Sequence, residues 1–202
     1  NVVILGGGTA GLSAARVAAG MGADVTVFDV DPLRMRRIEE LDGGAIRTRF
    51  STELDVAQAC AGADLVIGAV LVPGARTPRL VTREMVRAMR PGSVLVDIAI
   101  DQGGCFEDSR PTTHSEPTFE VEGSIFYCVA NMPGAVPHTS TYALTNATLT
   151  YALALADDGW RGACRARAEL GRGLSTHDGV LYTEGVGRAL GLETADAAAL
   201  LA

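Results

Sequence analysis

The sequence contains no lysine: all 17 residues counted as Lys or Arg are arginines. This absence excludes Schiff-base catalysis, and a Walker-type phosphate-binding lysine, from what the chain supplies by itself. The four cysteines are widely scattered and form no CxxC pair and no Cys/His cluster at metal-ligand spacing. We therefore expect reduced, packed thiols and no metal site.

The chain is also short of positive charge, with a formal net charge of −7 and a pI near 4.9. This balance argues against a surface that tracks nucleic-acid phosphates. No apolar run approaches the roughly 18 residues of a membrane helix, and no signal peptide is recognisable. We expect a cytoplasmic protein without nucleic-acid or membrane partners. Because the sequence starts without Met and directly at a strand-like run, we also expect a fragment or cleavage product of a longer chain.

Short β-branched runs alternate with helical stretches over about the first 130 residues. The predicted strands are 2–5, 24–28, 45–50, 65–70, 93–98 and 125–129. The predicted helices between them are 10–21, 32–41, 54–61 and 82–89. Strands alternating with helices indicate right-handed crossovers and a parallel sheet. The predicted fold class is therefore α/β, a doubly wound sheet of the Rossmann type.

The pattern changes in the second half of the chain. Residues 105–123 contain prolines, threonines and acids, which predicts a long surface loop. After the last strand, Pro133 and Pro137 interrupt the chain, and helices are predicted at 139–157, 160–170 and 182–190. We expect a dinucleotide-binding domain over 1–132 and a C-terminal helical segment over 133–202. For the tail from Glu193, both a helix and a frayed end stay open.

A glycine-rich turn follows the first predicted strand and opens the first helix at Thr9 and Ala10. Gly6, Gly8 and Gly11 give the spacing GxGxxG. In dinucleotide-binding domains the first glycine permits the tight turn, the second lets the backbone approach the pyrophosphate, and the third allows close helix packing. The helix N-terminus adds unpaired N–H groups and a positive dipole for the phosphates.

An acid at the end of the second strand strengthens this interpretation. Asp29 stands 18 residues after Gly11, where a carboxylate accepts hydrogen bonds from the adenosine ribose hydroxyls. The same carboxylate would repel the 2′-phosphate of NADP, so NAD is the predicted coenzyme. Arg34 could serve a 2′-phosphate, but an arginine on the next helix is more often solvated or lies along the adenine.

Two further strand ends supply candidates for the nicotinamide side. After the fourth strand, the apolar run 69–74, including Val70, Leu71 and Pro73, fits either a nicotinamide wall or ordinary strand-end core. After the fifth, Asp101 precedes a polar residue and two glycines and sits where a loop can offer it to the site. Asp97 is expected to be deeper and structural.

The three histidines, His114, His138 and His177, fall outside the predicted cleft and are interpreted as surface or loop residues. The sequence contains no recognisable Ser/His/Asp arrangement and no convincing general acid for carbonyl chemistry. It therefore predicts a coenzyme site without a complete catalytic apparatus.

Several of these motifs closely resemble the alanine dehydrogenase family. They are VILGGGTAG at 3–11, DLVIGAVLVPGA at 64–75, DIAIDQGGCFE at 97–107, SRPTT at 109–113, YCVANMP at 127–133 and TSTYALTNAT at 139–148. The resemblance covers nearly the whole chain. Its later motifs distinguish it from the coenzyme domain of proton-translocating transhydrogenases, which is similar mainly around the glycine loop.

The resemblance implies NAD binding and the interconversion of L-alanine with pyruvate and ammonia. It assigns Asp101 to the catalytic aspartate at the nicotinamide, and Asp29 to the adenosine ribose. The other residues it assigns to the coenzyme are Arg34 and Ser51 at the adenine end, and Val70, Leu71, Ile98, Asn131 and Met132 chiefly at the nicotinamide end.

Family members also carry an N-terminal substrate segment that has no counterpart here and supplies an Arg, a Lys and a catalytic His. We therefore expect residues 133–202 to belong to the substrate domain, and the chain alone to bind coenzyme without efficient turnover. L-alanine or pyruvate would bind only with that segment present, and a homo-oligomer is expected. The alternative is a non-catalytic NAD-binding module with a sensing or assembly role.

Overall fold

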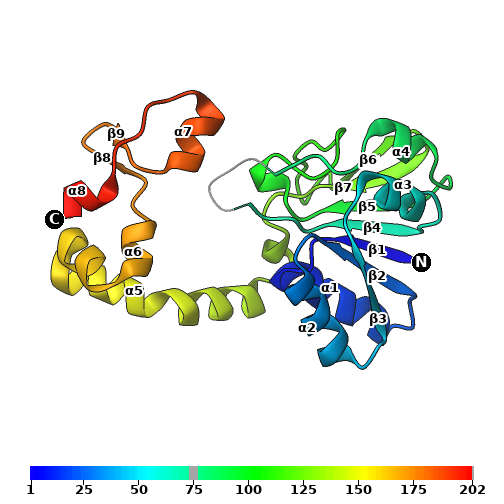
Figure 1. Ribbon diagram of the computed structural model, residues 1–202, viewed down its shortest axis with the longest axis horizontal. Helices are drawn as coiled ribbons and strands as arrows, with labels where there is room; N and C mark the ends of the chain where they lie inside the picture. Colours follow the sequence, from blue (N-terminus) through cyan, green and yellow to red (C-terminus); the bar gives the residue numbers. More distant parts are fainter. Residues whose placement is uncertain (73–76, 202) are drawn as a thin grey trace. The chain divides into compact units, whose positions relative to one another are not determined.

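The computed structural model describes residues 1–72 and 77–201, so Pro73 and Gly74 of the predicted nicotinamide wall lie outside the described residues. Contacts divide the described chain into two compact units (Figure 1). The first comprises residues 1–72 and 77–132, and the second residues 133–201.

The first unit is built on a seven-stranded sheet with strand order β3-β2-β1-β4-β5-β7-β6. The strands are β1 (Val2–Leu5), β2 (Val25–Asp29), β3 (Ile46–Phe50), β4 (Leu65–Gly68), β5 (Val94–Asp97), β6 (Thr118–Val121) and β7 (Ser124–Tyr127). All pairs are parallel except β6 with β7. The six predicted strands are present, with ends shifted by at most two residues. The prediction of a doubly wound α/β fold is confirmed.

The sheet is apolar on both faces because successive side chains of a strand point to opposite sides. Val2 and Ile4 of β1 belong to one buried cluster, which α1 (Thr9–Gly20) and α2 (Pro32–Asp42) cover. Val3 and Leu5 belong to the other, which includes residues of α3 (Glu53–Ala61) and α4 (Arg83–Arg87). The helices thus flank both faces of the sheet (Figure 1).

The prediction of a surface loop over residues 105–123 is wrong in part. Phe106 is fully buried, and its ring meets the Phe126 ring edge-on at a centroid distance of 6.0 Å. Strand β6 lies within the predicted loop, and its Phe119 ring stacks on Phe126 at 5.2 Å. Proline and acidic residues are tolerated here because β6 is a short antiparallel edge strand.

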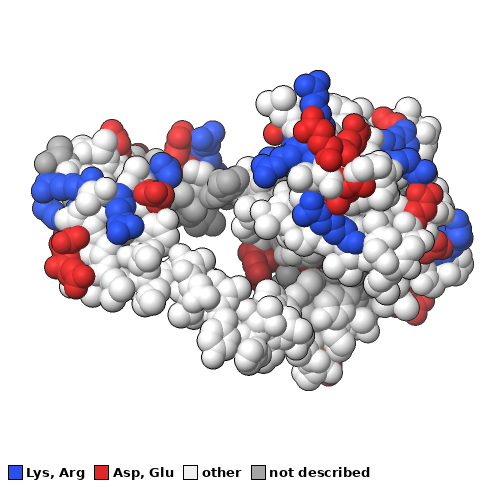
Figure 2. Space-filling model, turned by 90° about the horizontal axis from the view of Figure 1, so that it is seen from below, with Lys and Arg blue, Asp and Glu red and all other residues white. Residues whose placement is uncertain are grey.

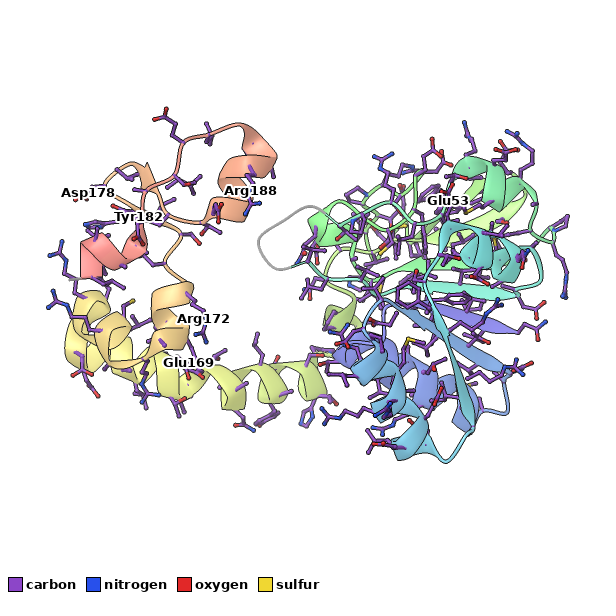
Figure 3. All side chains as sticks on the ribbon, in the orientation of Figure 1. Glu53, Glu169, Arg172, Asp178, Tyr182 and Arg188 are labelled. Atoms are coloured by element: carbon purple, nitrogen blue, oxygen red, sulfur yellow. The ribbon has the colours of Figure 1, made fainter. Side chains whose placement is uncertain are left out.

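The second unit is mainly helical. A 3₁₀ turn, η2 (Met132–Ala135), begins at the last residue of the first unit and leads into the second. The second unit then contains α5 (Pro137–Ala166), α6 (Ala168–Arg172), α7 (Glu184–Leu190) and α8 (Ala197–Leu201), with a small hairpin of β8 (Thr176–His177) and β9 (Val180–Leu181). The two predicted helices at 139–157 and 160–170 meet at Gly159, whose positive φ of 66° kinks α5. Arg188 of α7, labelled in Figure 3, forms an ion pair with Glu184 at 3.1 Å. The tail forms a short helix, α8.

All four cysteines are free and buried, which confirms the prediction that the thiols are packed. Burial raises the pKa of Cys60 and of Cys105 to about 12 and that of Cys128 to about 11, so these thiols stay protonated near neutral pH. Within residues 1–72 and 77–201, no helix combines the length and apolar character that crossing a membrane requires.

Acidic and basic side chains are interspersed on the face of the first unit seen in Figure 2. Arg83 and Arg87, for example, both pair with Glu122, at 3.4 and 3.2 Å.

Candidate coenzyme site

The strand order reverses between β1 and β4, which are neighbours in the sheet although α1 to α3 separate them in sequence. In doubly wound sheets, ligands bind at the carboxyl ends of the strands beside such a switch point. Every candidate residue of the sequence prediction follows the carboxyl end of a parallel strand. These are Gly6, Gly8, Thr9, Ala10 and Gly11 after β1, Asp29 and Arg34 at and after β2, Ser51 after β3, Val70 and Leu71 after β4, Ile98 and Asp101 after β5, and Asn131 and Met132 after β7.

The glycine loop is shaped by contacts that larger residues would prevent. Gly6 has a φ of 99°, and a Cβ there would lie 2.7 Å from the carbonyl oxygen of Ala69 beyond β4. A Cβ on Gly11 would lie 1.8 Å from the Gly6 carbonyl oxygen, so α1 packs directly on the turn. A Cβ on Gly8 meets nothing within 4 Å. Gly8 therefore has open space over it, as the pyrophosphate-approach role requires.

Gly8 is also the N-cap of α1, and no side chain in the described part of the protein caps this helix. Thr9 and Ala10, in its first turn, are exposed. Because the first N–H groups of a helix lack intrahelical partners, this terminus can donate to an anion. The loop thus fits a phosphate group.

Asp29 is 4% exposed and bonds to the glycine loop. Its Oδ2 accepts from the Gly7 N–H at 2.7 Å, and its Oδ1 accepts from the Asp31 N–H at 2.9 Å. The sequence analysis did not single out Gly7, because Gly7 occupies one of the unspecified (x) positions of GxGxxG. Its partner, Asp29, lies far away in the sequence, at the end of β2.

Arg34 completes the surroundings of Asp29. Its Nη1 donates to Oδ1 at 3.2 Å and to Oδ2 at 3.0 Å. Burial by itself raises the pKa of the Asp29 carboxyl, but the hydrogen bonds from Asp31, Gly7 and Arg34 together outweigh it and hold the pKa below its usual range. Asp29 is therefore ionised and presents acceptors only. Ser51 follows β3, and its N–H donates to the Asp29 carbonyl oxygen at 3.0 Å, which joins the ends of β2 and β3.

Beyond the switch point, Val70 is half-buried and packs against the core, whereas Leu71 is 62% exposed. Val70 thus has the packing of a strand-end core residue, and Leu71 has a side chain open to solvent. The Ile98 N–H donates to the Gly68 carbonyl oxygen at 2.9 Å, which joins the ends of β4 and β5. Asp101 follows in a 3₁₀ turn, η1 (Ile100–Gln102), and is exposed. A carboxylate so placed can reach a ligand.

Asn131 has a φ of 57°, a left-handed conformation that asparagine adopts more readily than most residues. Its carbonyl oxygen bonds with Nε2 of His114 at 3.1 Å. His114 is exposed, as predicted, and the long connection 105–123 brings it to the segment after β7, beside a candidate residue. Sequence spacing carries no signal for this contact.

Two other kinds of site, a metal centre and a surface hollow, were considered for the first unit. Among the described residues, no group of three or more His, Cys, Asp or Glu could hold a metal ion. A hollow of about 530 Å³ lies between α3 and α4 and is lined by helical residues such as Leu54 and Met85, with Glu53 labelled in Figure 3. It contains none of the residues predicted for the coenzyme site.

A phosphate-binding turn at the switch point, with an ionised carboxylate at the end of β2, defines a nucleotide-binding domain of the doubly wound class. A sequence-family profile described as "Alanine dehydrogenase/PNT, C-terminal domain" matches residues 1–184. The chain belongs to this family, whose domains bind pyridine nucleotides.

Individual relatives agree with this assignment. An alanine dehydrogenase of Mycolicibacterium smegmatis is 63% identical over 202 residues, which are 100% of this chain and 54% of that protein. The solved structure of an L-alanine dehydrogenase matches with a TM-score of 0.82 and 46% identity, over 94% of this chain and 52% of the other. A transhydrogenase of Sinorhizobium meliloti matches with a TM-score of 0.61 and 34% identity, over 70% and 40%. The chain thus spans about half the length of the alanine dehydrogenases it matches.

Proposed function

We propose that this chain is the coenzyme-binding part of an alanine dehydrogenase and that it binds NAD(H) in preference to NADP(H). The observation that carries the proposal is the placement of two carboxylates, Asp29 and Asp101, after β2 and β5 on either side of the glycine loop. One suits the adenosine ribose, and the other suits the reacting end of the dinucleotide.

The adenosine side would be held by hydrogen bonds. Asp29 would accept bonds from the ribose hydroxyls, in place of the Arg34 guanidinium that bonds to its oxygens in the structure. Arg34 and Ser51 then lie at the adenine end. A 2′-phosphate would meet the buried Asp29 charge, and this repulsion favours NAD over NADP.

On the other side, the nicotinamide half would be held by Val70, Leu71, Ile98, Asn131 and Met132, and Asp101 would be the catalytic residue. When bound, NAD would supply the hydride acceptor for the oxidation of L-alanine to pyruvate and ammonia. Asp101 holds the substrate amine and takes part in its proton transfer.

The chain offers no Lys and no cleft His for the substrate carboxylate and carbonyl. We infer that these groups come from the part of the relatives that precedes the matched region, that residues 133–202 pack with it as a substrate domain, and that the assembly is a cytoplasmic homo-oligomer.

Calorimetric titration of the 202-residue chain with both coenzymes tests the first claim. We expect a Kd for NADH at least about tenfold below that for NADPH, a difference of about 1.4 kcal/mol. Equal or tighter binding of NADPH would contradict the assignment of Asp29.

Turnover tests the second claim. In a chimera, the segment of the M. smegmatis relative that precedes the matched region is joined to this chain, and alanine oxidation is compared with that of the chain alone. We expect activity only in the chimera. Coenzyme binding without turnover in a folded chimera would favour the non-catalytic NAD-binding module.

A further inference from the structure

Asp97, the last residue of β5, is a fully buried carboxylate to which the proposed reaction assigns no role. Its Oδ1 accepts from the Ala99 N–H at 3.1 Å, and its Oδ2 accepts from the Cys105 N–H at 2.8 Å. The hydroxyl of Ser109 also donates to Oδ2. The two backbone donors lie on either side of Asp101 in the chain, so one carboxylate bonds to both ends of the Asp101 loop, residues 98–105.

The loop closes tightly around this carboxylate. The Gly104 N–H donates to the Ala99 carbonyl oxygen at 3.1 Å, which brings the two ends together. A Cβ on Gly104, whose φ is 81°, would lie 2.7 Å from Oδ2 of Asp97 and 2.7 Å from Cβ of Ser109. The backbone therefore packs directly on the carboxylate, while Asp101 stands exposed at the outer side of the loop.

The groups around Asp97 are hydrogen-bond donors. Burial raises the pKa of Asp97, against bonds from Ser109, Cys105, Phe106 and Ala99 that lower it. The Cys128 thiol donates in turn to the Ser109 oxygen at 3.9 Å. An ionised carboxylate, which only accepts, satisfies every one of these donors.

We propose that Asp97 is the positioning residue for Asp101: by bonding to the backbone on both sides, it fixes where the Asp101 carboxylate stands relative to the substrate amine. The inference rests on the proposed function, in which Asp101 acts at the nicotinamide end. A displacement of about 1 Å in a catalytic group can lower the rate about 10²-fold, so the Asp97 hydrogen bonds that fix the ends of the loop affect the reaction rate.

The variant Asp97→Asn separates the clamp from simple packing, because the amide has nearly the same volume as the carboxylate. It offers one acceptor oxygen and one NH₂ group, which only donates, instead of two acceptor oxygens. Whichever way the amide turns, its NH₂ group faces the N–H of Ala99 or that of Cys105. One end of the loop is then released while the core stays filled.

Amide hydrogen exchange in the 202-residue chain measures the release directly. We expect exchange at Ala99 and Cys105 to rise about tenfold or more in Asp97→Asn, with the amides of β1 and β2 unchanged, as for local opening. Ser109→Ala keeps the carboxylate and both backbone bonds, and should give a smaller rise at the same amides. It carries the test if Asp97→Asn does not fold. Unchanged exchange at Ala99 and Cys105 in both variants would overturn the proposal.

Turnover in the chimera measures the consequence. We expect Asp97→Asn to lower kcat about tenfold or more, with the Kd of ADP-ribose, a probe of the adenosine half alone, changed less than about threefold. The matched control is Asp64→Asn. Asp64 is exposed and precedes β4, at the amino ends of the parallel strands and away from the Asp101 loop, so this variant should leave both values unchanged. A normal kcat, or a parallel loss of ADP-ribose affinity, contradicts positioning.

The two proposals fail in different ways. If the unmodified chimera does not oxidise alanine, or if Asp101→Asn keeps full activity, the proposed function is wrong. The exchange measurement still decides whether Asp97 holds the loop, because it needs neither coenzyme nor turnover.

Discussion

Strands β2 and β5 both end in a buried aspartate, yet the two carboxylates are perturbed in opposite directions. Asp29 at the end of β2 has a lowered pKa and Asp97 at the end of β5 a raised one, although both accept backbone N–H bonds. Burial is the largest influence at both sites. At Asp97, which is fully buried, it outweighs the hydrogen bonds, whereas at Asp29 the bonds from Asp31, Gly7 and Arg34, the last pairing from the surface at 3.0 Å, outweigh it. One strand end can therefore bind a ligand through an ionised group, whereas the other uses its carboxylate to hold the chain.

Asp101 extends this comparison because it is the exposed carboxylate that Asp97 supports. In the chimera, we expect Asp101→Asn to lower the rate of alanine oxidation by about 10²-fold or more, the scale of a lost acid–base or electrostatic group. NADH affinity, measured by fluorescence titration, should change little because the proposed site holds the phosphates and adenosine at β1 and β2. Near-normal turnover would remove the chemical role assigned to the β5 end.

The glycine loop lies between the two strand ends and should serve both halves of the coenzyme. Gly8→Val should weaken binding of NADH by about tenfold or more, because its side chain occupies the open space that the pyrophosphate needs. Gly20→Ala is the matched control, since a Cβ there also meets nothing within 4 Å but lies at the far end of α1. Unchanged NADH affinity in Gly8→Val would mean that the phosphates bind elsewhere.

Asp29→Asn tests the β2 end directly. The amide keeps the size of the side chain but loses the charge that accepts from the ribose and repels a 2′-phosphate. We expect NADH to bind several-fold to about tenfold more weakly, since hydrogen bonds to a charged group are the stronger ones, and the preference over NADPH to shrink. Asp31→Asn, which keeps the N-cap of α2, serves as the control in the same titration. An unchanged preference in Asp29→Asn would contradict the ribose assignment.

The opposite pKa shifts also predict opposite effects of pH on stability. The lowered pKa of Asp29 gives stability that is present above the ordinary value of 3.8 and is lost as pH falls below it. The raised pKa of Asp97 gives a contribution that is present below 3.8 and is lost as pH rises through its folded-state value. Urea midpoints measured against pH for the wild type and both Asp→Asn variants should diverge in these two directions. Parallel curves would show that the carboxylates are not perturbed differently.

Much of the first unit was predictable because its strands are short and apolar, and because the segments between them have the hydrophobic periodicity of helices. Val2–Leu5 coincides with the predicted strand, and the glycine spacing located the turn that follows it. The glycines, Asp29 and Asp101 were candidates from the strand pattern, whereas the resemblance supplied others such as Ser51 and Asn131; parallel strands bring the carboxyl ends that precede them to one edge of the sheet. Asp97 was expected to be buried and structural, and it is.

The features that escaped prediction depend on the path of the chain rather than on local pattern. Strand β6 pairs only at an edge, so Thr118–Val121 lacks the apolar run that marks the central strands. The contacts of Gly7 with Asp29, and of His114 with Asn131, join residues 22 and 17 positions apart. Ser109 reaches Asp97 across a loop of 12 positions. No periodicity encodes such distances.

The buried thiols make the molecule its own reporter of local opening. Cys60 is on the buried side of α3, Cys105 ends the Asp101 loop, Cys128 contacts Ser109, which bonds to Asp97, and Cys164 lies in α5 of the second unit. A thiol reagent can modify each of them only when its surroundings part, because all four are shielded from solvent. The relative rates at which the four thiols are labelled would therefore show which regions of the chain open most often.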